Sequence, residues 1–525
     1  MVRRVAPEPL SVLAAVTAVV LLVPSTASAQ SVADHPRVTE AALLLETWLD
    51  AQRDYERIPG ASIAVVHDQE LVYSGGVGFA HVESQVPATP STMYSICSIS
   101  KLFTAVSVMQ LRDQGQLSLR DDVGDHLEWF DLQQTFPAAG PVTIKGVLTH
   151  SSGLPREADA PYWSGPDFPF PTRDQIVEGL SNQEMLYPAR THYQYSNLGL
   201  TLAGEIVMAR SGMSWDDYVS GHILQPLGMT NTTTEHMDEL RGKQLATGYS
   251  SLQRDGSRGL VPPYQVRGIG PAAGMLSTVE DLAKFAMWQF RVLDGSSEEV
   301  LDRNTLREMQ RVHWMEPDGN SSYGLGFSVS KRDGKTYVGH GGSCPGYESN
   351  LTIRPQDKIA TTFMTNGRRV SASSYARMAY DIMAPAILAA VAEGADAPVA
   401  QEDHAMSESM QSMMAGMSAE ERAAHHLQMH GPSLESLTGL YSRPLGTESM
   451  VTTWNGQLVV VGLPTSNPLT SMTRLKHIEG YSFRRVRPDG DLGEEYLFEA
   501  GPDGAMTYWV HNNPRHRTGL LGRGQ

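Results

Sequence analysis

Apolar positions in the first part of the chain switch between helical and strand spacing. Over residues 38–57 leucines and a tryptophan recur on one helical face, which predicts an amphipathic helix. Residues 61–79 hold two short apolar runs around the polar segment 67–70, which predicts two strands joined by a turn. Residues 98–115 return to helical spacing and end at Gly115, a common residue after a helix.

The middle of the chain, from about 120 to 320, shows mostly helical spacing with long loops. Strand-like alternation returns over 323–338 and 347–365, and a helix rich in Ala and Met is expected near 374–390. The order of strands, helices and strands again predicts an α/β domain with an inserted helical region.

Residues 393–432 interrupt this pattern. The part 393–418 has no aromatic residues and is rich in Ala, Ser, Met and Glu, which predicts a linker with a short helix. The whole segment holds six methionines and four histidines, a combination that can bind copper because thioethers suit Cu(I). A plain linker is the simpler interpretation, since Met also fills gaps in helical packing. We therefore assign no metal and no cofactor.

Residues 433–525 have a different pattern, with short apolar runs separated by turn signals such as Asn455-Gly456 and two Pro-Asp-Gly triplets. Short strands at this spacing predict a small antiparallel barrel or sandwich. The runs are Tyr441, 451–454, 458–463, 481–486, 496–498 and 506–510.

Composition narrows the class of protein. A chain of 525 residues exceeds the size of one hydrophobic core, so two domains are expected. The 41 Lys and Arg against 58 Asp and Glu give a net charge of −17, which argues against binding to nucleic acid or anionic membranes. Two cysteines exclude a disulfide framework and a Cys-based zinc site, and they allow at most one bridge.

Residues 1–29 have the pattern of a cleaved signal peptide: Arg3 and Arg4, an apolar run over 10–23, and the small-residue triplet 27–29. A membrane anchor would need about 18–20 unbroken apolar residues. We therefore expect an exported protein, periplasmic or secreted, without a transmembrane anchor.

Candidate chemistry begins at Ser98-Ile99-Ser100-Lys101. On a helix, side chains three residues apart lie together, so a Lys of lowered pKa at 101 can accept the proton of Ser98. The same Ser-x-x-Lys spacing recurs at Ser328 and Lys331, but there the pattern is strand-like and the two side chains point to opposite faces. We interpret the second copy as structural.

Two further motifs are individually weak. Tyr195-Ser-Asn197 precedes an apolar helical run, and a tyrosinate near a Lys would share proton transfer there. His340-Gly341-Gly342-Ser343 follows a predicted strand, where paired glycines let the backbone approach a ligand closely. A buried core tyrosine and a hairpin turn are the simpler interpretations of these two motifs.

Taken together, the three motifs resemble the signatures of the serine β-lactamase and penicillin-binding-protein superfamily. The resemblance extends over about 35–392 and favours the class C-like branch, which has Tyr in the middle motif. Longer strings carry it too: 141–155, 195–200 with 226–230, 272–277 and 323–327.

This resemblance implies an α/β domain over 30–392, with an antiparallel sheet, helices on both faces and an inserted helical subdomain. It also implies a role for each motif residue. Ser98 is the acylated nucleophile, Lys101 its proton partner and Tyr195 the general base and acid. Substrate contacts are assigned to Asn197, His340, Gly341 and Gly342, and the oxyanion hole to the N–H groups of Ser98 and Ser343.

Three features of the expected site bear on its substrate and its stability: a histidine in the third motif, a group of aromatic residues and the two cysteines. The histidine differs from the antibiotic-hydrolysing members of the superfamily. His340 replaces the usual Lys, and because a His is only partly charged near neutrality, weaker carboxylate recognition is expected. Aromatic residues 162, 163, 168 and 170 either border the pocket or pin a long loop. Cys97 and Cys344 occupy positions that a disulfide joins in some relatives, so a bridge is expected, with two buried free thiols as the alternative.

The leading functional hypothesis is an exported serine hydrolase that forms an acyl-enzyme on Ser98 with a small ester or a D-amino-acid peptide or amide. A β-lactamase and a catalytically weak penicillin-binding sensor are the alternatives. The last domain resembles lipocalin-like modules, and it either restricts access to the site or mediates assembly of a homo-oligomer.

Overall fold

The computed structural model describes residues 31–521 except 161–162, 164, 235–239, 241–242, 318, 320–321, 394–417, 419–426, 429–430, 444–447, 503 and 511–512. The expected signal peptide and most of the Met/His-containing linker lie outside these residues. Within the described part of the chain, no helix is both long and apolar enough to cross a bilayer.

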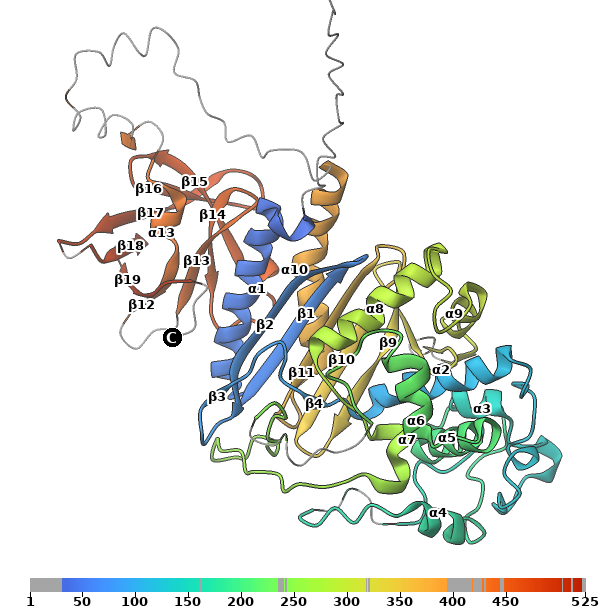
Figure 1. Cartoon of the computed structure of the whole chain (residues 1–525). Coiled ribbons are helices and arrows are strands. Elements are labelled where there is room, and N and C mark those ends of the chain that lie inside the picture. Colours follow the sequence, from blue (N-terminus) through green and yellow to red (C-terminus); the bar gives the residue numbers. More distant parts are fainter. Residues whose placement is uncertain are drawn as a thin grey trace, which may run out of the picture.

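The centre of the molecule is a nine-stranded antiparallel sheet (Figure 1). Its order is β3-β2-β1-β11-β10-β9-β8-β7-β6, so strands from the two ends of the domain, β1 and β11, pair side by side. The strands are β1 (Gly60–His67), β2 (Glu70–His81), β3 (Val86–Pro87), β6 (Trp314–Met315), β7 (Ser322–Tyr323), β8 (Ser328–Arg332), β9 (Lys335–Cys344), β10 (Tyr347–Arg354) and β11 (Ile359–Thr365).

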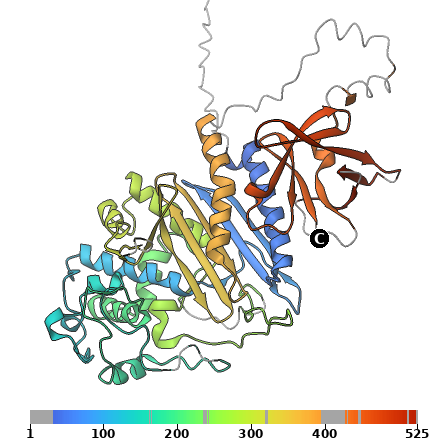
Figure 2. The ribbon, with the colours of Figure 1, turned by 180° about the vertical axis from the view of Figure 1, so that it is seen from behind.

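Helices cover both faces of this sheet, as expected. Helices α1 (Pro36–Tyr55) and α10 (Ala372–Glu393) pack together on one face, which Figure 2 shows from behind. Helix α8 (Val279–Asp294) packs on the other. Strand β1 serves both layers, because successive side chains point to opposite faces: Ile63 packs with α1 and α10, and Ala64 packs in the core on the other side.

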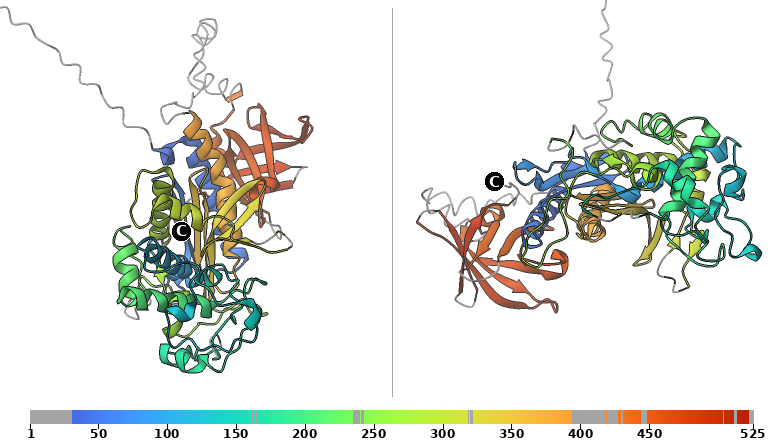
Figure 3. Two further views of the ribbon diagram at one scale, coloured as in Figure 1. Left: turned by 90° about the vertical axis from the view of Figure 1, so that its right-hand side faces the viewer. Right: turned by 90° about the horizontal axis from the view of Figure 1, so that it is seen from below.

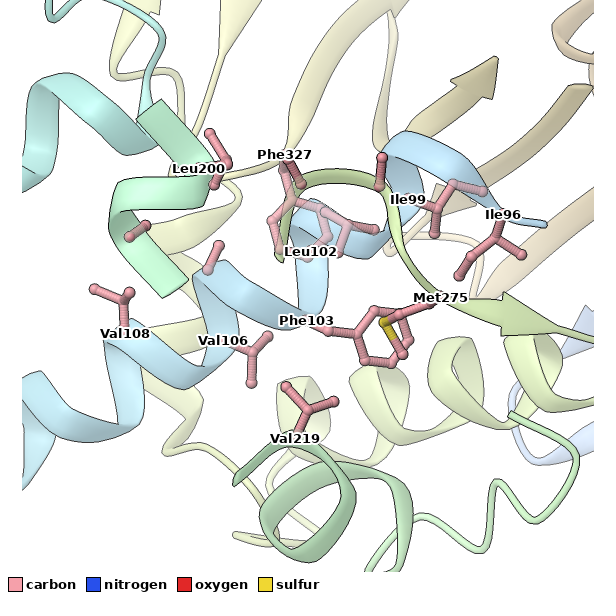
Figure 4. Packing of buried hydrophobic residues seen from close by; sticks show 14 of the residues in the cluster. Ile96, Ile99, Leu102, Phe103, Val106, Val108, Leu200, Val219, Met275 and Phe327 are labelled. Atoms are coloured by element: carbon pink, nitrogen blue, oxygen red, sulfur yellow. The ribbon is translucent and has the colours of Figure 1, made fainter. Parts of the chain in front are cut away.

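The inserted region is helical and lies beyond one end of the sheet (Figure 1). Helix α2 (Ser100–Asp113) runs into it and is buried from Ser100 to Leu111. Phe103, Val106 and Met275 belong to the apolar cluster around α2 (Figure 4), which holds this helix in place on all sides. The remaining elements are α3 (Ile144–Leu148), α4 (Arg173–Leu180), α5 (Asn197–Ser211), α6 (Trp215–Val219), α7 (Gly270–Ala273), α9 (Arg303–Met309) and the pair β4 (Tyr94–Ser95) and β5 (Leu276–Ser277).

The C-terminal part forms a closed barrel of eight strands. Of the two architectures expected from the sequence, the barrel is therefore correct and the sandwich is not. Its interior is filled by aromatic side chains, among them Tyr441, Phe483 and Tyr508. Two strands, β15 and β19, were missing from the sequence prediction. The strands are β12 (Gly439–Ser442), β13 (Ser449–Trp454), β14 (Gln457–Gly462), β15 (Met472–Glu479), β16 (Ser482–Val486), β17 (Leu492–Ala500), β18 (Met506–Val510) and β19 (Asn513–Gly519), with short helices α13 (Leu434–Leu437) and α14 (Pro468–Ser471).

The barrel packs against α1, at the opposite end of the molecule from the helical region (Figure 3). Met450 and Val461 of the barrel share one apolar cluster with α1 and α10. The indole Nε1 of Trp48 on α1 donates a hydrogen bond of 2.9 Å to the carbonyl oxygen of Thr465. The barrel is therefore docked on the helical layer that covers the back of the sheet.

Candidate active site

Ser98 lies in a tight turn, η2 (Cys97–Ile99), that leads directly into α2. The hydroxyl of Ser100 donates to the carbonyl oxygen of Cys97 at 2.6 Å and accepts from the backbone N–H of Met275 at 3.1 Å. Between Thr92 and Leu111 every residue except Ser98 is buried. The turn thus presents one hydroxyl from an otherwise buried segment.

Lys101 lies next to this hydroxyl. Its Nζ donates to Ser98 Oγ at 3.1 Å and to the carbonyl oxygen of Ala272 at 2.7 Å, and its side chain is fully buried. Burial lowers the pKa of Lys101 well below its usual value, because the charged form loses hydration. Because burial disfavours its ammonium form, a Lys in this position beside a serine is a better proton acceptor than an exposed one. The second Ser-x-x-Lys lies in β8, where Lys331 is exposed.

Tyr195 lies against both groups. Its ring centre is 4.9 Å from Lys101 Nζ, and its side chain hydrogen-bonds Ser98. Burial raises the pKa of Tyr195 above its usual value, more than the bond to Ser98 lowers it. The phenol therefore keeps its proton near neutral pH. The expected tyrosinate is wrong, because burial disfavours the anion.

His150 packs against Tyr195 and is part of none of the three motifs. The two rings are 4.3 Å apart between centroids, and His150 Nδ1 accepts a hydrogen bond of 3.1 Å from the N–H of Ser196. Ser196 Oγ also donates to the carbonyl oxygen of Pro155 at 2.6 Å. The sequence signal for His150 was its place in the string 141–155, which is part of the family resemblance.

His340 is engaged on both ring nitrogens. The Tyr323 hydroxyl contacts Nε2 at 2.6 Å, and Nδ1 contacts the carbonyl oxygen of Gly341 at 2.6 Å. Since a carbonyl only accepts, Nδ1 carries the proton and Nε2 accepts from Tyr323. Burial lowers the pKa of His340 to about 4, with Lys101 contributing. The expected partial charge at neutrality is therefore wrong, and His340 offers a carboxylate no cation.

Strand β9 comes very close to the Ser98 turn. A Cβ on Gly342 would lie only 2.1 Å from the carbonyl oxygen of Ile96, so this approach requires glycine. Ser349 Oγ of the neighbouring strand β10 donates to the same oxygen at 3.0 Å. A disulfide joins Cys97 to Cys344, with their Cα atoms 5.8 Å apart. The two residues just before Ser98, Ile96 and Cys97, are thus held against β9 and β10.

These elements enclose a cleft of about 390 Å³. Its walls include Ser98 and Ser343, the two expected sources of oxyanion N–H groups, and no barrel residue is among its described lining. A cavity of about 430 Å³ adjoins it along β8, β9 and α10 but does not contain Ser98. The cleft is lined by Ser98, Arg156, Tyr195, His340, Gly341, Gly342, Ser343, Glu348, Ser349, Asn350, Val370, Ser371, Ala372 and Ser373.

Asn197 is the first residue of α5 and is buried. Its Nδ2 donates to Glu157 Oε1 at 2.6 Å, and Trp163 Nε1 donates to the same oxygen at 3.0 Å. Burial raises the pKa of Glu157, while these hydrogen bonds oppose the rise. No motif pointed to Glu157, because its partner Asn197 is 40 residues away in sequence.

The described aromatic residues of the loop after 155 pack on each other rather than lining the cleft. Trp163 meets Phe170 edge-on at 4.9 Å between centroids, and Phe168 lies 5.2 Å from Tyr264. For these three residues the packing favours the pinning of the loop, while residue 162 lies outside the described part of the chain. Among the described residues there is also no group of three or more His, Cys, Asp or Glu side chains able to hold a metal ion.

Comparison with curated proteins finds chains of similar sequence. The chain is 27% identical over 327 residues to Beta-lactamase-like protein 2 of Dictyostelium discoideum, covering 61% of this chain and 58% of that protein. It is equally similar to Penicillin-binding protein 4 of Amycolatopsis lactamdurans, covering 83% of that protein. This chain thus spans less than two thirds of the length of the first relative.

Solved structures show the same fold. An octameric penicillin-binding protein homologue from Pyrococcus abyssi has a TM-score of 0.57 at 23% identity, covering 90% of this chain and 99% of its own. A D-stereospecific amidohydrolase from Streptomyces sp. has a TM-score of 0.54 at 22% identity, covering 65% of this chain and 98% of its own. The hydrolase EstCE1 has a TM-score of 0.55 at 19% identity, covering 66% of this chain and 100% of its own. The family model described as Beta-lactamase matches residues 45–383, and the chain therefore belongs to the beta-lactamase family.

Proposed function

We propose that this protein is a serine hydrolase that forms an acyl-enzyme on Ser98 and hydrolyses a small ester or a D-amino-acid peptide or amide. The observation that carries the proposal is the contact of 3.1 Å between Ser98 Oγ and the buried Nζ of Lys101, whose pKa burial lowers. Ester and D-amide substrates are favoured over β-lactams because the neutral His340 offers no cation to a β-lactam carboxylate.

Acylation begins when neutral Lys101 accepts the Ser98 proton and Oγ attacks the substrate carbonyl carbon. The N–H groups of Ser98 and Ser343 receive the resulting oxyanion. When the intermediate collapses, Tyr195 donates its proton to the leaving alcohol or amine and regains one from Lys101. A water molecule then attacks the ester on Ser98 with the same groups in the reverse roles, and the acid leaves.

Three further features belong to this proposal. Export to the periplasm or the outside follows from residues 1–29 and suits the disulfide, since disulfides persist in oxidising compartments. The substrate is a small molecule or a short peptide, because the cleft holds about 390 Å³. Assembly into a homo-oligomer is supported by the octameric structural neighbour, which covers 90% of this chain, and the barrel is the interface that we propose for it.

The test is intact mass spectrometry after incubation with a fluorophosphonate, a penicillin, p-nitrophenyl esters and D-alanyl amides, together with turnover measurements. We expect one fluorophosphonate adduct on Ser98 and turnover of esters or D-alanyl amides. Ser98→Ala abolishes both. Rapid β-lactam hydrolysis would instead indicate a β-lactamase, and a lasting penicillin adduct without turnover would indicate a sensor. Full activity of Ser98→Ala on every substrate would refute the mechanism.

A further inference from the structure

Tyr195 has a positively charged neighbour in the wall of the cleft. The guanidinium carbon of Arg156 lies over the Tyr195 ring, 4.9 Å from the ring centre. Lys101 Nζ is also 4.9 Å from that centre, so two basic side chains lie close to one phenol. Among the described residues that line the cleft, Arg156 is the only Lys or Arg. Arg156 is therefore the cation that the cleft itself presents to Tyr195.

The backbone holds Arg156 in this place. Its carbonyl oxygen accepts hydrogen bonds from the N–H groups of Asn197 at 2.8 Å and Leu198 at 3.2 Å, at the start of α5. Tyr195 lies two residues before Asn197, so the loop that carries Arg156 is paired with the segment that carries the phenol. These bonds involve only the main chain of Arg156, and a substitution of its side chain leaves them in place.

The carboxylate of Glu157, next to Arg156 in sequence, is shared among several donors. Arg156 Nε lies 3.5 Å from Glu157 Oε1. Asn197 Nδ2 and Trp163 Nε1 donate to the same oxygen over shorter distances, 2.6 and 3.0 Å. Glu157 therefore binds Asn197 and Trp163 more closely than Arg156, and the guanidinium remains over the phenol.

Charges near Tyr195 act on its phenol in opposite directions. Burial raises the pKa of Tyr195, Arg156 lowers it, and Glu157 raises it by less than Arg156 lowers it. Besides Lys101, the other ionisable side chains that the described residues place around the ring are neutral near neutral pH, because burial lowers the pKa of the histidines and raises that of the tyrosines. They are His150, Tyr193, Tyr323 and His340. On the cleft side, Arg156 is thus the charge that favours the phenolate form of Tyr195.

We infer that Arg156 is a positioning residue for the proton transfer from Tyr195 to the leaving group, an inference that rests on the proposed acyl-enzyme mechanism. When the intermediate collapses, the bond from the carbonyl carbon to the leaving oxygen or nitrogen breaks. Its electron pair moves to the leaving atom, which takes the proton of the Tyr195 hydroxyl. The phenolate that remains is stabilised by Arg156 and by protonated Lys101 until Lys101 returns a proton to it.

The contribution of Arg156 depends on the leaving group. A p-nitrophenolate is a stable anion near neutral pH and departs without a proton, whereas an alcohol or an amine must be protonated as it leaves. Arg156 therefore matters for alkyl esters and amides and has little effect on activated aryl esters. Substrates with strongly basic leaving groups are the class that this arrangement serves.

The experiment compares p-nitrophenyl, phenyl and ethyl propanoate, which all form the same propanoyl-enzyme on Ser98. Their kcat/KM values report acylation alone, and all three are neutral, so attraction of Arg156 to a charged substrate plays no part. Arg156→Met should lower kcat/KM for the ethyl ester by about tenfold or more and for the p-nitrophenyl ester by less than about threefold, with the phenyl ester in between. Arg156→Lys, which keeps the charge, should recover most of the rate on the ethyl ester.

Arg307→Met is the matched control. Arg307 is exposed on α9 and is not among the described residues that line the cleft, so the same change there should alter none of the three rates. Fluorophosphonate labelling of Ser98 reports whether each variant is folded.

Equal losses on the three esters would mean a structural role for Arg156 and would overturn the inference, as would unchanged rates in Arg156→Met. The inference also fails if Arg156→Lys loses as much as Arg156→Met, because charge would then not be the cause. A wild type that hydrolyses the p-nitrophenyl ester alone would show that Tyr195 protonates no leaving group. Absence of both Ser98 labelling and p-nitrophenyl propanoate hydrolysis in the wild type would instead refute the proposed function itself.

Discussion

At the scale of single residues, burial decides the protonation states of the cleft. Lys101 and Tyr195 are both held near Ser98 in an environment that disfavours charge, so the pKa of the Lys falls and that of the Tyr rises. The two shifts have opposite consequences: Lys101 becomes the better proton acceptor and Tyr195 the better proton donor. Burial beside Ser98 thus favours Lys101 as the proton acceptor and Tyr195 as the proton donor.

The role of Lys101 is tested by Lys101→Met, which keeps the apolar stem and removes the base. Positioned general bases typically contribute about 10²–10⁴ in rate, and a loss of kcat/KM of that size is expected on p-nitrophenyl esters. Lys331→Met, in the second Ser-x-x-Lys, should leave the rate unchanged because Lys331 is exposed on β8. Equal activities of the two variants would contradict the assignment of Lys101.

His340 makes stability depend on pH. Its pKa is about 4 in the folded protein against 6.5 ordinarily, so between these values the unfolded chain binds a proton that the native state does not. The free energy of unfolding should therefore fall as the pH decreases from 6.5 to 4, by up to about 3 kcal/mol from this group.

Urea unfolding at pH 4.5 and pH 7 measures this dependence. His150, whose pKa burial also lowers, contributes in the same direction, so the contribution of His340 is the difference between the wild type and His340→Gln. The variant should lose less stability on acidification. An identical loss in both proteins would show that His340 is not buried in its neutral form.

At the scale of elements, the site depends on strand β9 lying against the turn η2. Gly342 permits the approach and the disulfide from Cys97 to Cys344 ties the two elements across 247 residues of sequence. A link over so long a loop restricts the unfolded chain strongly, which raises the stability of the native state.

Replacing both cysteines, in Cys97→Ser with Cys344→Ser, should lower the free energy of unfolding by about 2–5 kcal/mol. The matched comparison is the wild type under reducing conditions, which should approach the melting temperature of the double variant. If the double variant melts like the oxidised wild type, the bridge does not support the site.

At the scale of the whole molecule, the barrel and the cleft are separate. The barrel docks on α1 behind the sheet, and none of its described residues lines the cleft. Within one chain the described part of the barrel therefore packs behind the sheet and away from Ser98, which argues against the first of the two roles expected for it, restricting access to the site.

Trp48→Ala tests this separation, since Trp48 is 3% exposed, packs in the shared apolar cluster and bonds Thr465. Loss of the side chain should cost about 3–5 kcal/mol of stability. Hydrolysis of a small ester, measured well below the melting temperature, should stay within about twofold, because neither Trp48 nor Thr465 lines the cleft and the two sites share no partner. Leu520→Ala, in an exposed residue just after β19 of the barrel, should change neither quantity. A parallel loss of activity would show that the barrel controls the site.

The two barrel strands that the sequence analysis did not predict, β15 and β19, lack the alternation of apolar and polar residues by which strands are recognised in a sequence. Strand β19 reads Asn-Pro-Arg-His-Arg-Thr-Gly and contains no large apolar residue, and β15 buries only Leu475. Both are strands because they close the barrel through backbone pairing with β12, β18, β14 and β16. A pattern search has no signal for a strand whose stability comes from its neighbours.

Periodicity and short-range spacing are local properties of the chain, so they were enough to predict the alternation of helices and strands, the Ser98–Lys101 pair and the three motifs. The protonation of His340 and Tyr195 and the contact of Asn197 with Glu157 arise only in the folded chain. These depend on burial and on contacts between residues far apart in sequence, and no local pattern encodes them.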